Sequence, residues 1–376
     1  MTKARYIMLG GFLGAGKTTA VARLAQHLSA QGKRMGLITN DQGKGLVDTA
    51  MLSSRGFEVE EIAGGCFCCR FNSLLEAARS LSATTKPDVF IAEPVGSCTD
   101  LVATVTYPLR RIYGDEFTIA PLSVLVDAVR AMRVLGLTRG PKFSEKVLYI
   151  YRKQLEEADI IVINKVDLID RAELATLQDE LRKQFPQAKQ HVVSARKGDG
   201  LPEWFDEIAQ SEQQPRTVMG VDYQIYADGE ALLGWLNATV RFKFAEPTDV
   251  NALIEDLASA VQRRLEVEAV QIAHFKMTFD ANHPFGELAA ISLVRNDYVP
   301  ELSQTLADPV TEGELVINLR AEADPALLRK AVEQGLYGVT EEGMDYKIED
   351  IESFRPGKPV PTHRITDEKP ASSPLR

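Results

Sequence analysis

The fold is decided by one stretch near the start of the chain, Gly11-Phe12-Leu13-Gly14-Ala15-Gly16-Lys17-Thr18. This stretch fits the phosphate-loop pattern G-x-x-x-x-G-K-[ST]. The apolar run at residues 5–10 is typical of a buried strand, and apolar residues recur at helical spacing after Lys17. A phosphate loop requires this strand, loop and helix order, so we expect the loop to bind a nucleoside triphosphate.

The residue types of the loop suit the phosphates of a nucleotide. Glycine lets the backbone approach closely enough for its N–H groups to point at phosphate oxygens, and the helix N-terminus adds positive potential. We expect Lys17 to reach the β and γ phosphates and Thr18 to bind Mg²⁺. The residues of this loop predicted to contact the nucleotide are Gly11, Gly14, Ala15, Gly16, Lys17, Thr18 and Thr19.

A base-recognition loop is predicted at Asn164-Lys165-Val166-Asp167, directly after the apolar run at residues 159–163. The Asp167 carboxylate can accept hydrogen bonds from N1–H and the 2-amino group of guanine, whereas adenine lacks that amino group. Further along the chain, Ser194 and Ala195 resemble the loop that backs the guanine in GTPases. We therefore expect GTP and GDP, rather than ATP, as the nucleotides.

Three of the four cysteines lie close together in Gly64-Gly65-Cys66-Phe67-Cys68-Cys69-Arg70. Buried thiols in an apolar core are one explanation, but a core does not require such clustering. A disulfide framework is disfavoured, because a large chain with four cysteines and no secretory features belongs in a reducing compartment. Clustered thiolates suit Zn²⁺, Cu(I), Co²⁺ or Ni²⁺, so we expect a transition-metal site at Cys66, Cys68 and Cys69.

Three thiolates on one loop leave the coordination shell of such a metal incomplete. We expect the fourth ligand from Asp41, water or a second copy of the chain, and the last of these would give a GTP-dependent homodimer. The fourth cysteine, Cys98, follows Glu93-Pro94-Val95-Gly96-Ser97 and could approach the cluster in space. For Cys98 itself we favour a packing role, because a thiol is a small apolar side chain.

Together these motifs resemble the CobW/HypB/UreG family of metal-related P-loop GTPases, with its CobW branch the most similar. The resemblance covers roughly residues 5–210 and includes the phosphate loop, residues 66–69, residues 93–96 and residues 164–167. It implies that Glu93 holds the Mg²⁺ water shell or the attacking water, and that Asp41 is a switch I carboxylate. Relatives usually carry Glu at the position of Asp41 and often have Glu where this chain has Lys44. The metal geometry of the relatives therefore cannot be applied to this chain in full.

The resemblance implies a GTP-hydrolysing metallochaperone or metal- or cofactor-insertion factor, with Zn²⁺ or Co²⁺ as the metal and a metalloenzyme or corrinoid protein as the client. In this interpretation Lys17, Glu93 and Asp41 serve catalysis, and intrinsic hydrolysis is slow, on the order of 10⁻² s⁻¹ or less. The alternative is a GTP-gated protein chaperone for a corrinoid (cobalamin) enzyme or methyltransferase, with structural or redox-active cysteines. A small-molecule kinase is disfavoured, because the base loop specifies guanine.

Strand and helix patterns alternate through the first half of the chain, which predicts an α/β P-loop domain with a mostly parallel sheet at residues 1–210. Period-two runs and two amphipathic helices predict an α+β domain of ferredoxin-like character at residues 219–355. Residues 356–376 are rich in proline, serine and charge, which predicts a disordered tail.

The composition limits the partners of the chain. A net charge of −10 and a pI near 5.2 disfavour nucleic acid and anionic membranes. No segment approaches the ~20 apolar residues that cross a bilayer. We expect a soluble, cytoplasmic protein.

Overall fold

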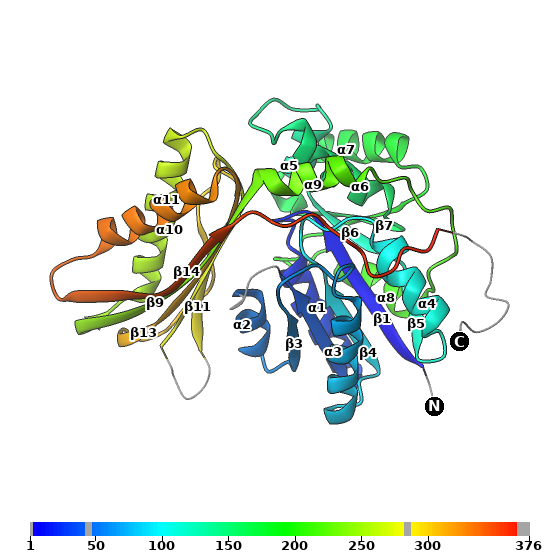
Figure 1. The fold of residues 1–376 in the computed structure, drawn as a ribbon, viewed down its shortest axis with the longest axis horizontal. Coiled ribbons are helices and arrows are strands. Elements are labelled where there is room, and N and C mark those ends of the chain that lie inside the picture. Colours follow the sequence, from blue (N-terminus) through cyan, green and yellow to red (C-terminus); the bar gives the residue numbers. More distant parts are fainter. Residues whose placement is uncertain (1–2, 42–46, 282–286, 367–376) are drawn as a thin grey trace. The chain divides into compact units, whose positions relative to one another are not determined.

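The alternating strands and helices of the first half form a parallel sheet with the order β3-β2-β4-β1-β6-β7-β8, and β5 also pairs with β1 (Figure 1). The computed structural model describes residues 3–41, 47–281 and 287–366. The sheet confirms the predicted P-loop fold class, because the paired strands all run parallel. Its strands are β1 (Ala4–Gly11), β2 (Met35–Asn40), β3 (Val59–Ile62), β4 (Val89–Glu93), β5 (Phe117–Ile119), β6 (Ser123–Asp127), β7 (Ile160–Asn164) and β8 (Lys189–Val192).

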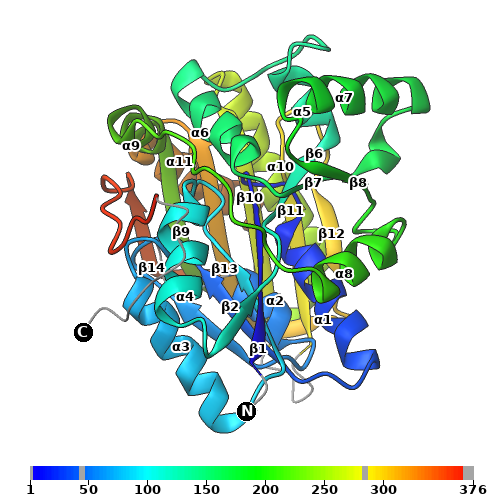
Figure 2. The same ribbon diagram turned by 90° about the vertical axis from the view of Figure 1, so that its right-hand side faces the viewer.

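Helices cover both faces of this sheet, so its central strands are buried on both sides. In Figure 2, α1 and α8 lie on one side of β1, and α3 and α6 lie on the other. Among the described residues, none of the helices has the length and apolarity needed to cross a membrane. The helices of this part are α1 (Lys17–Ala30), α3 (Phe71–Thr84), α4 (Tyr107–Ile112), α5 (Ala128–Val134), α6 (Glu145–Glu156), α7 (Arg171–Gln184) and α8 (Leu201–Gln210), with η1 (Val102–Thr106) and η2 (Val166–Leu168) between them.

The second half forms an antiparallel sheet with the order β12-β11-β10-β13-β9-β14. The strands β14, β9, β13 and β10 have the order and connections of a ferredoxin-like fold, and β11 and β12 extend its edge. Helices α10 and α11 pack closely, because a Cβ at Gly335 would lie 2.8 Å from the Val261 side chain. The elements are β9 (Leu233–Thr248), α10 (Val250–Val267), β10 (Gln271–Asp280), β11 (Leu288–Leu293), β12 (Glu301–Gln304), β13 (Val310–Glu322), α11 (Pro325–Val339) and β14 (Met344–Phe354).

The two structural units are not the two continuous stretches that the sequence predicts. The first unit comprises the described residues within Met1–Gln42, Phe57–Ala227 and Pro359–Arg376, and the second those within Gly43–Gly56 and Asp228–Lys358. The boundary lies inside α9 (Tyr223–Leu232) rather than near residue 215. Helix α2 (Val47–Ser53) belongs to the second unit. Two contacts explain this: Lys276 Nζ lies 2.5 Å from Asp48 Oδ1, and the Val47 N–H donates to Asn318 Oδ1.

The prediction of a disordered tail from residue 356 is wrong for residues 359–366, which we call the C-terminal strap (red in Figure 1). The strap belongs to the first unit. The backbone N–H of Thr362 donates to the Cys68 carbonyl (2.8 Å), and that of Ile365 donates to the Ala103 carbonyl (2.8 Å). Arg364 Nε donates to Asp100 Oδ2 (2.7 Å). These hydrogen bonds fix a segment whose composition alone predicts disorder; residues 367–376 lie outside the described part of the chain.

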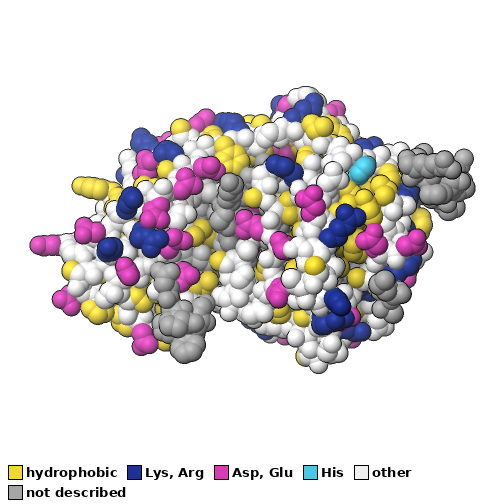
Figure 3. Space-filling model, turned by 60° about the horizontal axis from the view of Figure 1, so that its bottom comes forward, with side chains coloured by type: hydrophobic (Ala, Val, Ile, Leu, Met, Phe, Trp, Pro, Cys, Tyr) yellow, Lys and Arg dark blue, Asp and Glu magenta, His cyan; other side chains and the backbone are white. Residues whose placement is uncertain are grey.

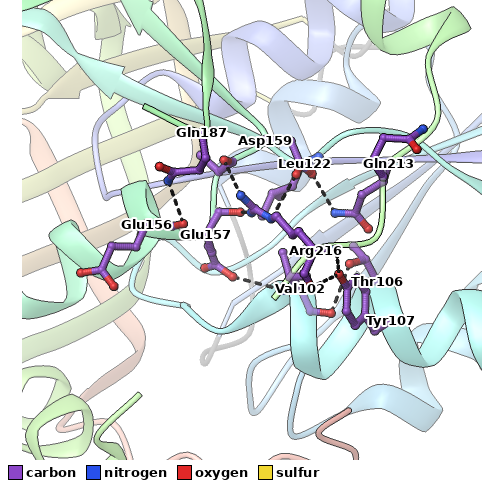
Figure 4. A network of polar contacts seen from close by, with 12 residues as sticks. Val102, Thr106, Tyr107, Leu122, Glu156, Glu157, Asp159, Gln187, Gln213 and Arg216 are labelled. Carbon is purple, nitrogen blue, oxygen red and sulfur yellow. Dashed lines mark hydrogen bonds and ion pairs between the residues drawn. The ribbon is translucent and has the colours of Figure 1, made fainter. Parts of the chain in front are cut away.

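A buried polar network joins the end of α6 to the segment after residue 98 (Figure 4). The Glu157 carboxylate accepts hydrogen bonds from Thr99 Oγ1 and the Val102 N–H, each at 3.1 Å. Arg216 donates to the Glu157 and Ala158 carbonyls and pairs with Asp159. Burial, together with the nearby charge of Asp100, raises the pKa of Glu157 to about 8.

The raised pKa of Glu157 predicts a pH-dependent stability. Between pH 4.5, the ordinary pKa of this carboxyl, and about 8, the folded chain holds a proton that the unfolded chain releases, so this contribution is lost as pH rises. Glu157→Gln keeps an acceptor for Val102 and supplies a donor to Thr99 without a charge. We expect equal melting temperatures near pH 5 and a more stable variant at pH 9, by on the order of 2 kcal/mol.

The measurement is the melting temperature from pH 5 to 9, with Glu156→Gln as the control. Glu156 is the adjacent carboxylate, but it is partly exposed and pairs with Lys153. Parallel pH profiles for the wild type and Glu157→Gln would contradict the raised pKa assigned to Glu157.

Candidate nucleotide and metal site

The predicted site residues follow the carboxyl ends of neighbouring strands in the parallel sheet. The phosphate loop follows β1, Asp41 follows β2, the cysteine loop follows β3, Glu93 ends β4, and the base loop follows β7. The carboxyl ends of parallel strands lie at one edge of a sheet, which is where α/β proteins bind their ligands. The described structure therefore brings together residues that the sequence separates widely.

The phosphate loop has the backbone that its glycines allow. Gly16 has a φ of 94°, and a Cβ there would lie 2.4 Å from Asn164 Nδ2, so both conformation and space require glycine. Helix α1 begins at the next residue, Lys17, and Thr18 follows; both side chains are buried. Thr18 Oγ1 donates to Glu93 Oε1 (3.1 Å), and Lys17 Nζ lies 4.0 Å from the same oxygen. The three residues predicted to bind phosphate and Mg²⁺ thus meet at one point.

The Asn164 side chain ties the base loop to the phosphate loop. Its Nδ2 donates to the Ala15 carbonyl (2.8 Å), and its Oδ1 accepts from the N–H groups of Lys165 (2.8 Å) and Ala195 (2.9 Å). Lys165 Nζ donates to the Gly14 carbonyl (2.7 Å). One amide therefore connects the phosphate loop with both segments predicted to surround the base.

Asp167 and Ser194 both contact Lys197. Asp167 is part of η2, and its carboxylate lies 3.9 Å from Lys197 Nζ. Ser194 is buried, and its hydroxyl accepts from the Lys197 N–H. Lys197 therefore contacts both Asp167 and Ser194. The residues predicted to bind the base are close to one another.

Two residues of the site were not predicted from the sequence. Asp127 ends β6, accepts from Lys165 Nζ (2.8 Å) and caps α5 by accepting from the Arg130 N–H. The buried Arg130 donates from Nη1 to the Leu13 carbonyl in the phosphate loop (2.6 Å). The sequence feature that could have identified Asp127 is its position at the end of an apolar strand. Nothing in the local sequence indicates the contact of Arg130 with Leu13.

Asn40 links the end of β2 to the cysteine loop. Its Nδ2 donates to the carbonyls of Ile62 (2.8 Å) and Gly65 (2.6 Å), and the latter directly precedes Cys66. The neighbouring Asp41 is buried, and its N–H donates to the Ile62 carbonyl. Lys44, the departure from the family pattern, lies outside the described residues.

The thiols of Cys66, Cys68 and Cys69 form one cluster. Their Sγ atoms are separated by 2.7 Å (Cys66 and Cys68), 3.2 Å (Cys66 and Cys69) and 3.7 Å (Cys68 and Cys69). A tetrahedral site with Zn–S bonds of 2.3 Å has sulfur pairs about 3.8 Å apart, so a small expansion of the cluster would accommodate the metal. The described cysteines form no disulfide. This donor set fits a transition-metal ion.

Hydrogen bonds among the three thiols shift their pKa values in opposite directions. The neighbouring thiols of Cys68 and Cys69 hold the pKa of Cys66 well below its usual value. The hydrogen bond with Cys66 raises the pKa of Cys68, and the hydrogen bond with Cys66, together with burial, raises the pKa of Cys69 to about 11. One thiolate stabilised by two thiols is a suitable entry point for a soft cation, because the thiolate is the form that binds metal.

Comparisons with known proteins find a family model and relatives that match the first half of the chain. Residues 5–192 match the family model described as CobW/HypB/UreG, nucleotide-binding domain. The chain is 31% identical over 218 residues to a zinc chaperone CobW of Sinorhizobium sp, covering 51% of this chain and 59% of that one. It is 31% identical over 163 residues to the zinc chaperone YeiR of Escherichia coli (strain K12), covering 43% and 46%. The solved Zn(II)-bound YjiA GTPase from E. coli is 16% identical with a TM-score of 0.37, and the match covers 91% of this chain and 100% of that one.

The chain belongs to the CobW/HypB/UreG family, since the family model covers half of it. The resemblance noted in the sequence is thereby confirmed. The chain spans about half the length of the curated relatives it matches.

Proposed function

We propose that this chain is a GTPase metallochaperone that binds Mg²⁺ and GTP at the phosphate and base loops and carries a transition-metal ion, Zn²⁺ or Co²⁺, on Cys66, Cys68 and Cys69. The observation that supports it best is the arrangement of three thiols and a phosphate loop at one edge of one sheet. Relatives named zinc chaperones favour Zn²⁺ as the cargo. The client is a metalloprotein that accepts this ion.

The residues at the phosphate loop would have separate roles in hydrolysis. Lys17 would neutralise charge on the β and γ phosphates, and Thr18 would ligate Mg²⁺. Glu93, hydrogen-bonded to Thr18, would orient the metal-bound or attacking water, and Asp41 would approach the same region from switch I. When bound, Mg²⁺ supplies positive charge that stabilises the transferring phosphoryl group. No arginine of the chain is assigned to the transition state, so the intrinsic rate would be slow.

Charge on the surface is consistent with a protein client. On the face shown in Figure 3, basic and acidic side chains are interspersed rather than separated by sign. The chain carries a net charge of −10. A strongly negative chain disfavours nucleic acid as the partner.

The first test is base selectivity. Asp167→Asn replaces an acceptor with a donor, which matches the 2-carbonyl of xanthine rather than the 2-amino group of guanine. We expect GDP affinity to fall about 100-fold or more, and XDP to bind the variant more tightly than GDP does. Titration with fluorescent GDP, XDP and ADP measures this. Wild-type protein that binds ADP as tightly as GDP would show that the base loop is assigned wrongly.

The second test separates binding from hydrolysis. Glu93→Gln removes the carboxylate charge but keeps an acceptor for Thr18, so we expect nearly unchanged GTP affinity and kcat lowered about 10- to 100-fold. Lys17→Ala is the contrasting variant, and we expect it to weaken binding itself. Single-turnover phosphate release gives the rates. Equal rates for Glu93→Gln and the wild type would remove Glu93 from the mechanism.

The third test couples metal to nucleotide. If hydrolysis releases the cargo, the metal must bind with different affinity in the Mg²⁺–GTP-analogue and Mg²⁺–GDP states, and the nucleotide affinities must then differ by the same factor with and without metal. Zn²⁺ and Co²⁺ are titrated into both states and into nucleotide-free protein, with a Cys66/Cys68/Cys69→Ser triple variant as control. Equal affinities in all states, or unchanged binding in the triple variant, would contradict the metallochaperone and favour a chaperone for a corrinoid enzyme.

A further inference from the structure

The C-terminal strap contacts two of the three cysteines of the cluster. The Val360 N–H donates to Cys69 Sγ (3.3 Å), and the Thr362 hydroxyl donates to the Cys69 carbonyl (3.2 Å). The N–H of Thr362 donates to the Cys68 carbonyl (2.8 Å). Cys66 and Cys68 are buried, whereas Cys69 is partly exposed. The strap therefore lies against the most accessible thiol of the cluster.

An ion pair holds the next part of the strap. Arg364 Nε donates to Asp100 Oδ2 (2.7 Å), and Arg364 Nη2 donates to Asp100 Oδ1 (3.4 Å). Asp100 is 1% exposed, and the Tyr223 hydroxyl donates to its Oδ2 (2.6 Å). Removing one partner of a buried pair leaves an uncompensated charge. The pair therefore favours the strap in the position where it lies against the cysteines.

The strap is held mainly by polar contacts at the surface. The Val360 side chain is 71% exposed, and the His363 ring packs edge-on against Phe71, with 5.0 Å between the ring centroids. Exposed hydrogen bonds and few buried apolar contacts are typical of segments that open locally at a low cost in free energy. The strap can therefore undock while the rest of the first unit stays folded.

We propose that the C-terminal strap closes the metal site. When docked it covers the Cys69 thiol and retains the ion, and when undocked it opens the cluster to the ligands of the client. The inference rests on the proposed function, because it concerns the transfer of the same cargo ion. The Val360 N–H donates to a sulfur that would bind this ion, and hydrogen bonds to metal ligands strengthen metal binding. Arg364 is a positioning residue, since it acts on the site through the strap.

The first test measures access to Cys69 in the metal-free, full-length chain. Arg364→Ala leaves the buried Asp100 without this cation when the strap is docked, so we expect a larger undocked population. Alkylation of Cys69 by iodoacetamide, located by mass spectrometry, should be at least about 10-fold faster, and hydrogen exchange at the amides of Thr362 and Ile365 should be faster as well. GDP binding by each variant reports that the first unit is folded.

Two further variants control this test. Arg364→Lys keeps a cation opposite Asp100 and should restore most of the protection. Arg355→Ala removes an arginine that pairs with Asp324 in the second unit, and it should leave alkylation and exchange unchanged.

The second test follows the ion. Zn²⁺-loaded wild type and Arg364→Ala are mixed with a chromophoric zinc chelator, and we expect release at least about 10-fold faster from the variant. Equal alkylation and exchange rates in the two proteins, or faster alkylation with unchanged Zn²⁺ release, would overturn the inference and leave the metallochaperone proposal standing. Wild-type protein that binds neither Co²⁺ nor Zn²⁺ stoichiometrically would overturn both, whatever the alkylation rates.

Discussion

Parallel pairing of β1 with β4 on one side and with β6 on the other is the constraint on which the site depends. Parallel strands end at the same edge of a sheet, so the loops that follow them must meet there. In this chain those loops carry carboxylates, an amide, a lysine and thiols, and the main role of the sheet is to bring them together. Side-chain hydrogen bonds from Asn164 and Asn40 then join adjacent loops to one another.

Much of the first unit could be predicted from local sequence. Apolar runs mark β1, β2, β4, β6 and β7, since strands buried on both faces are continuously apolar. The phosphate loop and the base loop could be predicted as motifs because each has a characteristic pattern of residue types and a fixed place after a strand. The ferredoxin-like unit could be predicted as well, because its strands alternate in polarity and its helices are amphipathic.

What could not be predicted depends on contacts between distant segments. Arg130 contacts the Leu13 carbonyl only because β1 and β6 are neighbours in the sheet, and no sequence period predicts this contact. The C-terminal strap could not be predicted for the same reason. Its composition is that of a disordered segment, yet the Val360 N–H donates to Cys69 Sγ (3.3 Å) and Arg364 pairs with Asp100. Composition predicts the cost of ordering a segment, but it does not predict the partners that offset this cost.

The path of the chain limits how its halves can be exchanged during evolution. It enters the second unit for α2, returns to the first for β3, enters the second again after residue 227 and ends with the strap on the first. A recombination event near residue 215 would separate α2 from the sheet that binds it through Lys276 and Asn318, and would join the cysteine loop to a foreign strap. The two units are therefore expected to be inherited together. The residues where the chain passes from one unit to the other are expected to change together during evolution.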